Sequence, residues 1–120
     1  MSKAGDRATA ILAYLEDQVD AMIEMLMDLA SHESPSDVPE SQVGVQGQLT
    51  KFLQEMDFRI RHVPGRKTGG HLFAVPINRD RDMPVQLLVG HTDTVWPLGT
   101  TDSMPVVIEN GIVRGQVPSI

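Results

Sequence analysis

The stretch Val85-Gln86-Leu87-Leu88-Val89-Gly90-His91-Thr92-Asp93-Thr94-Val95-Trp96-Pro97 decides the expected fold. Its first five residues form a nearly unbroken apolar run, which is typical of a central strand covered on both faces. Gly90 ends that run, and a histidine and an aspartate follow within three residues. We therefore predict a buried strand over 85–89, with polar side chains just beyond its carboxyl end.

Two helices are expected upstream of this strand. Between Arg7 and Ala30, apolar residues recur every three or four positions, which places them on one helical stripe that we expect to be buried. A loop rich in serine and proline over 31–40 separates this helix from a second one over 41–56. The apolar stripe of the first helix consists of Leu12, Leu15, Val19, Met22, Leu26 and Leu29.

Further strands are expected on both sides of the central one. Apolar and polar residues alternate over 58–63, and a second short strand over 71–75 ends at Pro76. Asn110-Gly111, between apolar runs, is a strong signal for a hairpin. Two helices followed by several strands indicate an α/β fold with a mixed sheet around the central strand.

Length, charge and composition exclude several classes of protein. The chain has 120 residues, a formal net charge of −6 and no cysteine. This length allows one small domain, the acidic balance argues against nucleic-acid binding, and the lack of cysteine excludes disulfides and thiol catalysis. No apolar run reaches the roughly 20 residues of a membrane-spanning helix, and the N-terminus has no apolar signal core. We therefore expect a soluble, cytoplasmic protein that contacts neither nucleic acid nor membrane.

His91 and Asp93 are the candidate functional residues. His91 follows the predicted strand, at the edge where open α/β sheets place their active sites. If the chain stays extended, Asp93 points to the same side, because side chains two residues apart share a face. A carboxylate there accepts the imidazole N–H and leaves the other ring nitrogen for a metal. By itself, however, His-x-Asp is more often structural, and zinc usually needs three or four protein ligands.

The remaining candidate groups favour structural or surface roles. A hydrolase that uses His91 as a general base needs a nucleophile, but no nucleophile motif surrounds Thr92 or Thr94. The other histidines fall at a helix end and at strand edges: His32, His62 and His71. A basic cluster is expected to be a solvated face rather than an anion site: Arg59, Arg61, Arg66 and Lys67.

The stretch 87–99, followed by Pro105 and by 110–115, resembles the first metal-binding block of the M20 family of zinc-dependent exopeptidases and amidohydrolases. Its Trp-Pro-x-Gly continuation is most similar to the glutamate carboxypeptidase branch. The loop 34–36, Ser-Pro-Ser, resembles the family's loop after the first helix. The resemblance covers most of the chain and implies the N-terminal part of a zinc-exopeptidase-type catalytic domain.

By this resemblance, His91 is a ligand of one of two zinc ions, and Asp93 is the catalytic residue that holds its imidazole. In the family, a hydroxide between the two metals attacks an amide carbonyl, and a glutamate transfers the proton to the leaving amine. The implied substrate is a small peptide or an N-acyl amino acid, cleaved next to a free carboxylate. A homodimer is a possible state of the full-length enzyme. The resemblance does not identify the substrate-binding residues.

The sequence departs from the family pattern after Gly115. The family continues with Gly-Pro-Gly-x-Phe/Tyr-Asp-Met-Lys, whose aspartate bridges the metals, whereas this chain reads Gln-Val-Pro-Ser-Ile over 116–120. Deleting one base from suitable codons for the family signature yields this ending followed by a stop. We therefore hypothesise that residues 1–120 are a frameshifted or misread N-terminal portion of the catalytic domain. The remaining ligands and the lid or dimerisation domain would then be absent, and Asp-Met-Lys codons would follow in the gene in another frame.

Two functional hypotheses remain open at this point. In the first, the chain is the N-terminal portion of an M20-like metallohydrolase and is inactive alone. In the second, it is a non-catalytic truncated fragment or binding module that retains the first layer of the fold. Tight zinc binding, or hydrolysis of an N-acyl glutamate by the chain itself, would distinguish an active enzyme from either of these.

Overall fold

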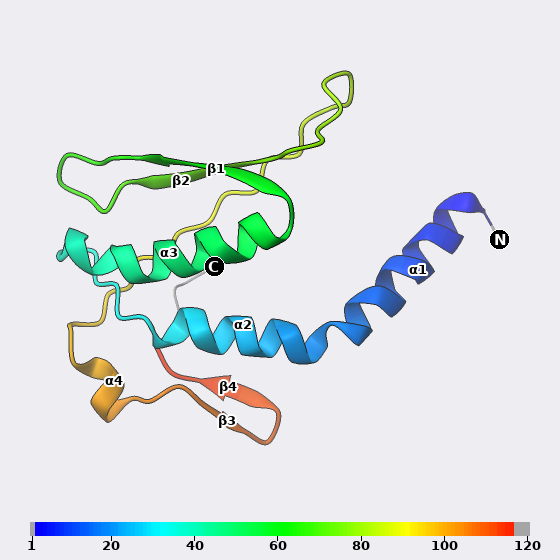
Figure 1. Ribbon diagram of the computed structural model, residues 1–120. Coiled ribbons are helices and arrows are strands. Elements are labelled where there is room, and N and C mark those ends of the chain that lie inside the picture. Colours follow the sequence, from blue (N-terminus) through cyan, green and yellow to red (C-terminus); the bar gives the residue numbers. More distant parts are fainter. Residues whose placement is uncertain (1, 117–120) are drawn as a thin grey trace.

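The computed structural model describes residues 2–116, in which helices and two small antiparallel sheets occur together (Figure 1). This mixture is compatible with the predicted combination of α and β structure. Residues 117–120, which include most of the departure from the family pattern, lie outside the described residues. In chain order the elements are α1 (Lys3–Asp17), α2 (Val19–Ser31), the 3-10 helix η1 (Pro39–Ser41), α3 (Gln42–Glu55), β1 (Phe58–Val63), β2 (His71–Pro76), α4 (Thr100–Ser103), β3 (Val107–Glu109) and β4 (Ile112–Arg114).

The predicted single helix over 7–30 is in fact two helices, α1 and α2, that meet at Gln18. Gln18 leaves helical geometry with φ −95° and ψ 0°. The predicted burial of the apolar stripe is wrong, because no residue of α1 is buried and Ala30 is the buried residue of α2. α1 extends away from the other elements (Figure 1), and its Leu12 is 57% exposed. Within residues 2–116, no helix is both long and apolar enough to cross a membrane.

The second predicted helix and the first two predicted strands are confirmed as α3, β1 and β2. β1 and β2 pair antiparallel, from Phe58 opposite Pro76 to Val63 opposite His71. α3 packs on this sheet with Val45 buried, and the Gln46 side chain donates a hydrogen bond to the Gly69 carbonyl at 3.1 Å. This layer of one helix on two strands is the main packed unit of the described chain.

The predicted hairpin at Asn110-Gly111 is also confirmed. It joins β3 and β4, which pair antiparallel with Val107 opposite Arg114. Asn110 and Gly111 have φ values of 51° and 76°. Positive φ at both central residues is the geometry of the type I′ turn, whose twist suits a two-residue hairpin.

The segment 85–89 is the main departure from the predicted fold. It belongs to neither sheet, and Leu88 is 96% exposed. The predicted mixed sheet with a central buried strand is therefore wrong for residues 2–116. A central strand needs a neighbouring strand on each side for its N–H and C=O groups. No described residue forms a backbone hydrogen bond with this segment.

The described chain is more open than a closed domain of its length. Its accessible surface is 9518 Å², whereas a folded monomer of this mass exposes about 6,400 Å². Its radius of gyration is 17.0 Å, against about 13.6 Å for a compact domain of the same length. Much apolar surface is therefore uncovered, including Leu12 of α1 and Leu88.

This openness predicts weak cooperativity of unfolding. We expect the 120-residue chain to lose its helical circular dichroism over a broad temperature range as a monomer, because few apolar side chains leave water on folding. Calorimetry at low protein concentration is the check. A sharp two-state transition, with an unfolding enthalpy near the usual value of about 0.7 kcal/mol per residue, would contradict this expectation.

Candidate functional site

The candidate site forms where the loop after α2 meets the chain that follows segment 85–89. Pro35 and Thr94 form a parallel β-bridge. The Thr94 N–H donates to the Ser34 carbonyl at 2.8 Å, and the Ser36 N–H donates to the Thr94 carbonyl at 3.0 Å. Ser34, Pro35 and Thr94 are almost fully buried. The bridge therefore joins two loops that lie far apart in the sequence and fixes the position of residues 91–93.

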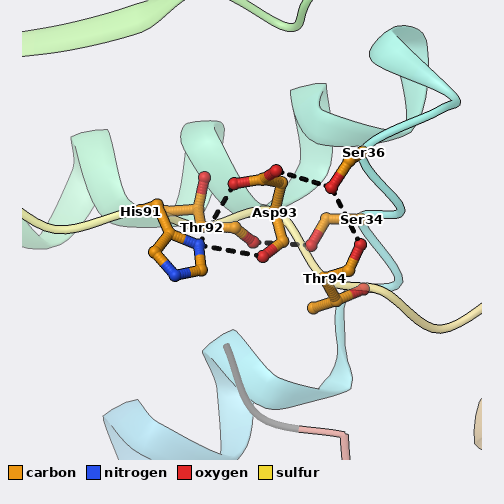
Figure 2. Close-up of polar contacts among 6 residues, drawn as sticks. All are labelled: Ser34, Ser36, His91, Thr92, Asp93 and Thr94. Carbon is orange, nitrogen blue, oxygen red and sulfur yellow. Dashed lines mark hydrogen bonds and ion pairs between the residues drawn. The ribbon is translucent and has the colours of Figure 1, made fainter. Parts of the chain in front are cut away.

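The structure brings the two predicted site residues together. His91 Nδ1 lies 3.1 Å from Asp93 Oδ1 and 3.1 Å from the Asp93 backbone oxygen. Both partners accept hydrogen bonds, so Nδ1 carries the hydrogen, and in the neutral ring Nε2 carries the free lone pair. Nε2 points away from Asp93 (Figure 2). The His91 side chain is 52% exposed, so a ligand can reach Nε2.

The second oxygen of Asp93 is held by a serine that sequence reasoning did not assign to the site. The Ser36 hydroxyl donates to Asp93 Oδ2 at 2.6 Å (Figure 2). This hydrogen bond is the main cause that lowers the pKa of Asp93. Burial opposes it, and the Asp93 backbone and the His91 imidazole lower the pKa further. Asp93 is therefore a carboxylate at neutral pH, with one oxygen facing Ser36 and the other facing His91.

A second serine of the same loop holds the chain between the two site residues. The Ser34 hydroxyl donates to the Thr92 carbonyl at 2.7 Å. The Thr94 hydroxyl is buried and has no hydrogen-bond partner among the described residues. Within residues 2–116, no hydrogen bond joins either threonine hydroxyl to His91. This arrangement does not favour a hydrolase in which His91 activates one of these threonines.

Glu33 ties the segment after the site to the same loop. Its carboxylate accepts hydrogen bonds from the Gly99 N–H at 2.8 Å, the Thr101 N–H at 2.8 Å and the Thr101 hydroxyl at 2.9 Å. These contacts, led by the one with Gly99, lower the pKa of Glu33. No local pattern in the sequence predicts them, because the partners lie more than sixty positions away. The only signal is that Glu33 adjoins the Ser-Pro-Ser loop.

The described residues offer one oriented metal ligand and not a complete metal site. Residues 2–116 contain no group of three or more histidine, aspartate or glutamate side chains that could hold a metal ion. His62 lies elsewhere, with Nε2 at 3.0 Å from Gln46 Oε1, and the His32 ring packs against Gly44. The chemistry of the donor set therefore fits zinc at a single position, His91 Nε2.

Comparison with known proteins finds no match for this chain among family models, curated proteins or solved structures. The likeness to the M20 family rests on the sequence motifs around His91, and membership of that family stays a prediction.

Replacing Glu33 by alanine is expected to loosen Gly99 and the first turn of α4. The two backbone N–H groups that Glu33 accepts from then lose their shared partner. We expect their amide hydrogen exchange to quicken by about tenfold, as for the loss of one or two hydrogen bonds to a charged group. Glu40→Ala, at the exposed position of η1, is the matched control. Unchanged protection of both amides in Glu33→Ala would contradict this role.

The same contacts predict a dependence on pH. A folded pKa of Glu33 below the ordinary value of about 4.3 means that its ionised form is favoured by folding. The contribution is complete above the ordinary pKa and is lost as the pH falls through the lowered folded value. Protection of the Gly99 and Thr101 amides, corrected for intrinsic exchange, should therefore decline below about pH 4. Protection that is constant down to pH 2.5 would count against the carboxylate as the acceptor.

Proposed function

We propose that this chain supplies one zinc ligand, His91, and its orienting carboxylate, Asp93, to a two-zinc metallohydrolase similar to the M20 family. The observation that carries the proposal is the pair itself: Asp93 binds the Nδ1 hydrogen of His91 at 3.1 Å, and Nε2 faces outward. A carboxylate that fixes the tautomer in this way is the usual partner of a zinc-bound histidine. The reaction proposed is hydrolysis of an amide or peptide bond next to a free carboxylate.

The uncovered segment 85–89 supports the view that these residues are part of a larger catalytic domain. Its four apolar side chains are all exposed in the described chain. In an open α/β sheet, a strand of this composition is covered on both faces and leads into the active-site edge. The proposal assigns its neighbours, the other metal ligands and the proton-transferring glutamate to polypeptide beyond these 120 residues.

The proposed mechanism gives each site residue a defined task. Zinc, when bound, lowers the pKa of a coordinated water and polarises the amide carbonyl. His91 would hold the metal through Nε2, while Asp93 accepts the Nδ1 hydrogen and so orients the ring and raises its basicity. Ser34 fixes the intervening backbone through the Thr92 carbonyl. Small peptides or N-acyl amino acids in the cytoplasm are the proposed substrates.

For the 120 residues alone, the single histidine ligand among the described residues supports the inactivity that both hypotheses expect of this chain. Calorimetric titration with Zn²⁺ should show only weak binding, and His91→Ala should remove no more of it than His71→Ala, which changes an exposed histidine of β2. Tight binding with one-to-one stoichiometry would contradict the proposed incompleteness of the site.

The hydrolase proposal is tested on a longer polypeptide in which the remaining metal ligands of the proposed catalytic domain follow these residues. It should hydrolyse an N-acyl glutamate in the presence of Zn²⁺. His91→Ala should abolish this activity, and Asp93→Ala should reduce it by about 10- to 100-fold, as expected for the partner of a metal ligand. His71→Ala is the control. Absence of hydrolysis, or full activity in His91→Ala, would refute the proposed function.

A further inference from the structure

The Ser36 hydroxyl, on the loop after α2, faces two acceptors on the loop that carries His91. Its oxygen lies 2.6 Å from Asp93 Oδ2 and 3.1 Å from the Thr94 carbonyl oxygen. A hydroxyl has a single hydrogen to donate, so the two acceptors compete for it. The contact with Asp93 is the shorter one and ends on a charged group, and such bonds are the stronger ones. The hydrogen is therefore donated mainly to Asp93.

Ser36 is itself held in place by the backbone. Its N–H donates to the Thr94 carbonyl at 3.0 Å, next to the almost fully buried Pro35 and Thr94. The hydroxyl is thus presented to Asp93 from a fixed point of the opposite loop. A donor on such a support can define the orientation of its acceptor.

Asp93 needs such a constraint because its own torsion does not define the carboxylate plane. The terminal torsion of aspartate is broad, and this side chain is 39% exposed, so water competes for both oxygens. With Oδ2 fixed by Ser36, Oδ1 faces His91 Nδ1 (Figure 2). Oδ1 is therefore the carboxylate oxygen that meets the His91 imidazole.

We propose that Ser36 is a positioning residue whose hydroxyl holds the Asp93 carboxylate so that His91 carries its hydrogen on Nδ1 and presents Nε2 to a ligand. The inference rests on the proposed function only for the nature of that ligand. The hydrogen-bond chain Ser36–Asp93–His91 exists whether or not the longer polypeptide is a hydrolase. Its test therefore reads the imidazole directly and requires neither metal nor activity.

The test measures the tautomer of His91 by long-range proton–nitrogen NMR on the ¹⁵N-histidine-labelled chain, with the signal assigned through His91→Gln. The spectra are recorded at a pH above which the His91 signals no longer shift, so that the ring is neutral. The wild-type ring should be mainly the Nδ1–H tautomer. In Ser36→Ala, the ratio of Nδ1–H to Nε2–H should fall by about three- to tenfold. Oδ1 is then free to turn away from Nδ1, and the uncharged backbone oxygen of Asp93 is the acceptor that remains.

Two further variants separate positioning from a general effect on the fold. Ser36→Thr keeps the hydroxyl on an exposed residue and should restore the wild-type ratio. Ser41→Ala is the matched control, because its hydroxyl donates to the Val38 carbonyl at 2.6 Å in the same loop but does not contact Asp93. Protection of the Thr94 amide reports whether the bridge between the loops persists in each variant. If the bridge is lost in Ser36→Ala, Ser36→Cys is used in place of the alanine variant, because it nearly keeps the side-chain volume and has a weaker donor.

The outcomes are decisive in each case. A reduced Nδ1–H fraction in Ser36→Ala or Ser36→Cys with the bridge intact, restored by threonine, supports the inference. An unchanged ratio with the bridge intact overturns it, and so does a failure of Ser36→Thr to restore the ratio. A wild-type His91 ring without a preference for Nδ1–H overturns it as well. Loss of hydrolysis in the longer polypeptide would refute the proposed function and leave this result untouched.

Discussion

The pairing of the Ser34–Ser36 backbone with Thr94 is the interaction on which the site depends. It consists of two backbone hydrogen bonds and places an almost fully buried serine, proline and threonine at the junction. Segment 85–89 pairs with no strand among the described residues, so the chain that leaves it is positioned by this bridge and by the side-chain contacts of the same loop. The position of His91 therefore follows from a contact made three residues further along.

Carboxylates connect the loops around this bridge. Asp93 receives a hydrogen from Ser36 on one oxygen and faces His91 with the other, while Glu33 accepts from Gly99 and Thr101. In both cases a negatively charged acceptor on one loop meets a donor on the other, and such bonds are stronger than neutral ones. Both contacts lower the pKa of the carboxyl group, so both persist at neutral pH. Asp93 and Glu33 therefore stabilise the contacts between the loops in addition to contributing to the net charge.

Sequence reasoning succeeded where the signal is local. Alternation over β1 and the Asn110-Gly111 turn are properties of a few adjacent residues, and both elements form as predicted. The proximity of His91 and Asp93 is also local, because two positions separate them. Ser36 and Glu33 could not be assigned to the site in this way, since their partners lie 57 and more positions along the chain. The motif around 34–36 marked the loop but did not show which side chain each hydroxyl meets.

The two wrong predictions of burial share one physical cause. An apolar stripe or run predicts that a face will be buried, but burial needs a second surface. Leu12 on α1 and Leu88 in segment 85–89 carry the expected pattern, and within residues 2–116 nothing covers either side chain. Helix periodicity alone sufficed to form α1, since its hydrogen bonds lie within the element. A central strand needs neighbouring strands for its hydrogen bonds. The apolar pattern therefore accompanies a helix in α1 but no sheet at 85–89.

The exchange rate of the Thr94 amide hydrogen tests the central claim most directly. This amide donates to the Ser34 carbonyl at 2.8 Å inside the bridge that positions His91 and Asp93. The account predicts that it exchanges at least about tenfold more slowly, after correction for intrinsic rates, than the amide of exposed Leu88. Exchange of Thr94 at the rate of Leu88 in the intact chain would show that the loops are not joined and would contradict the account.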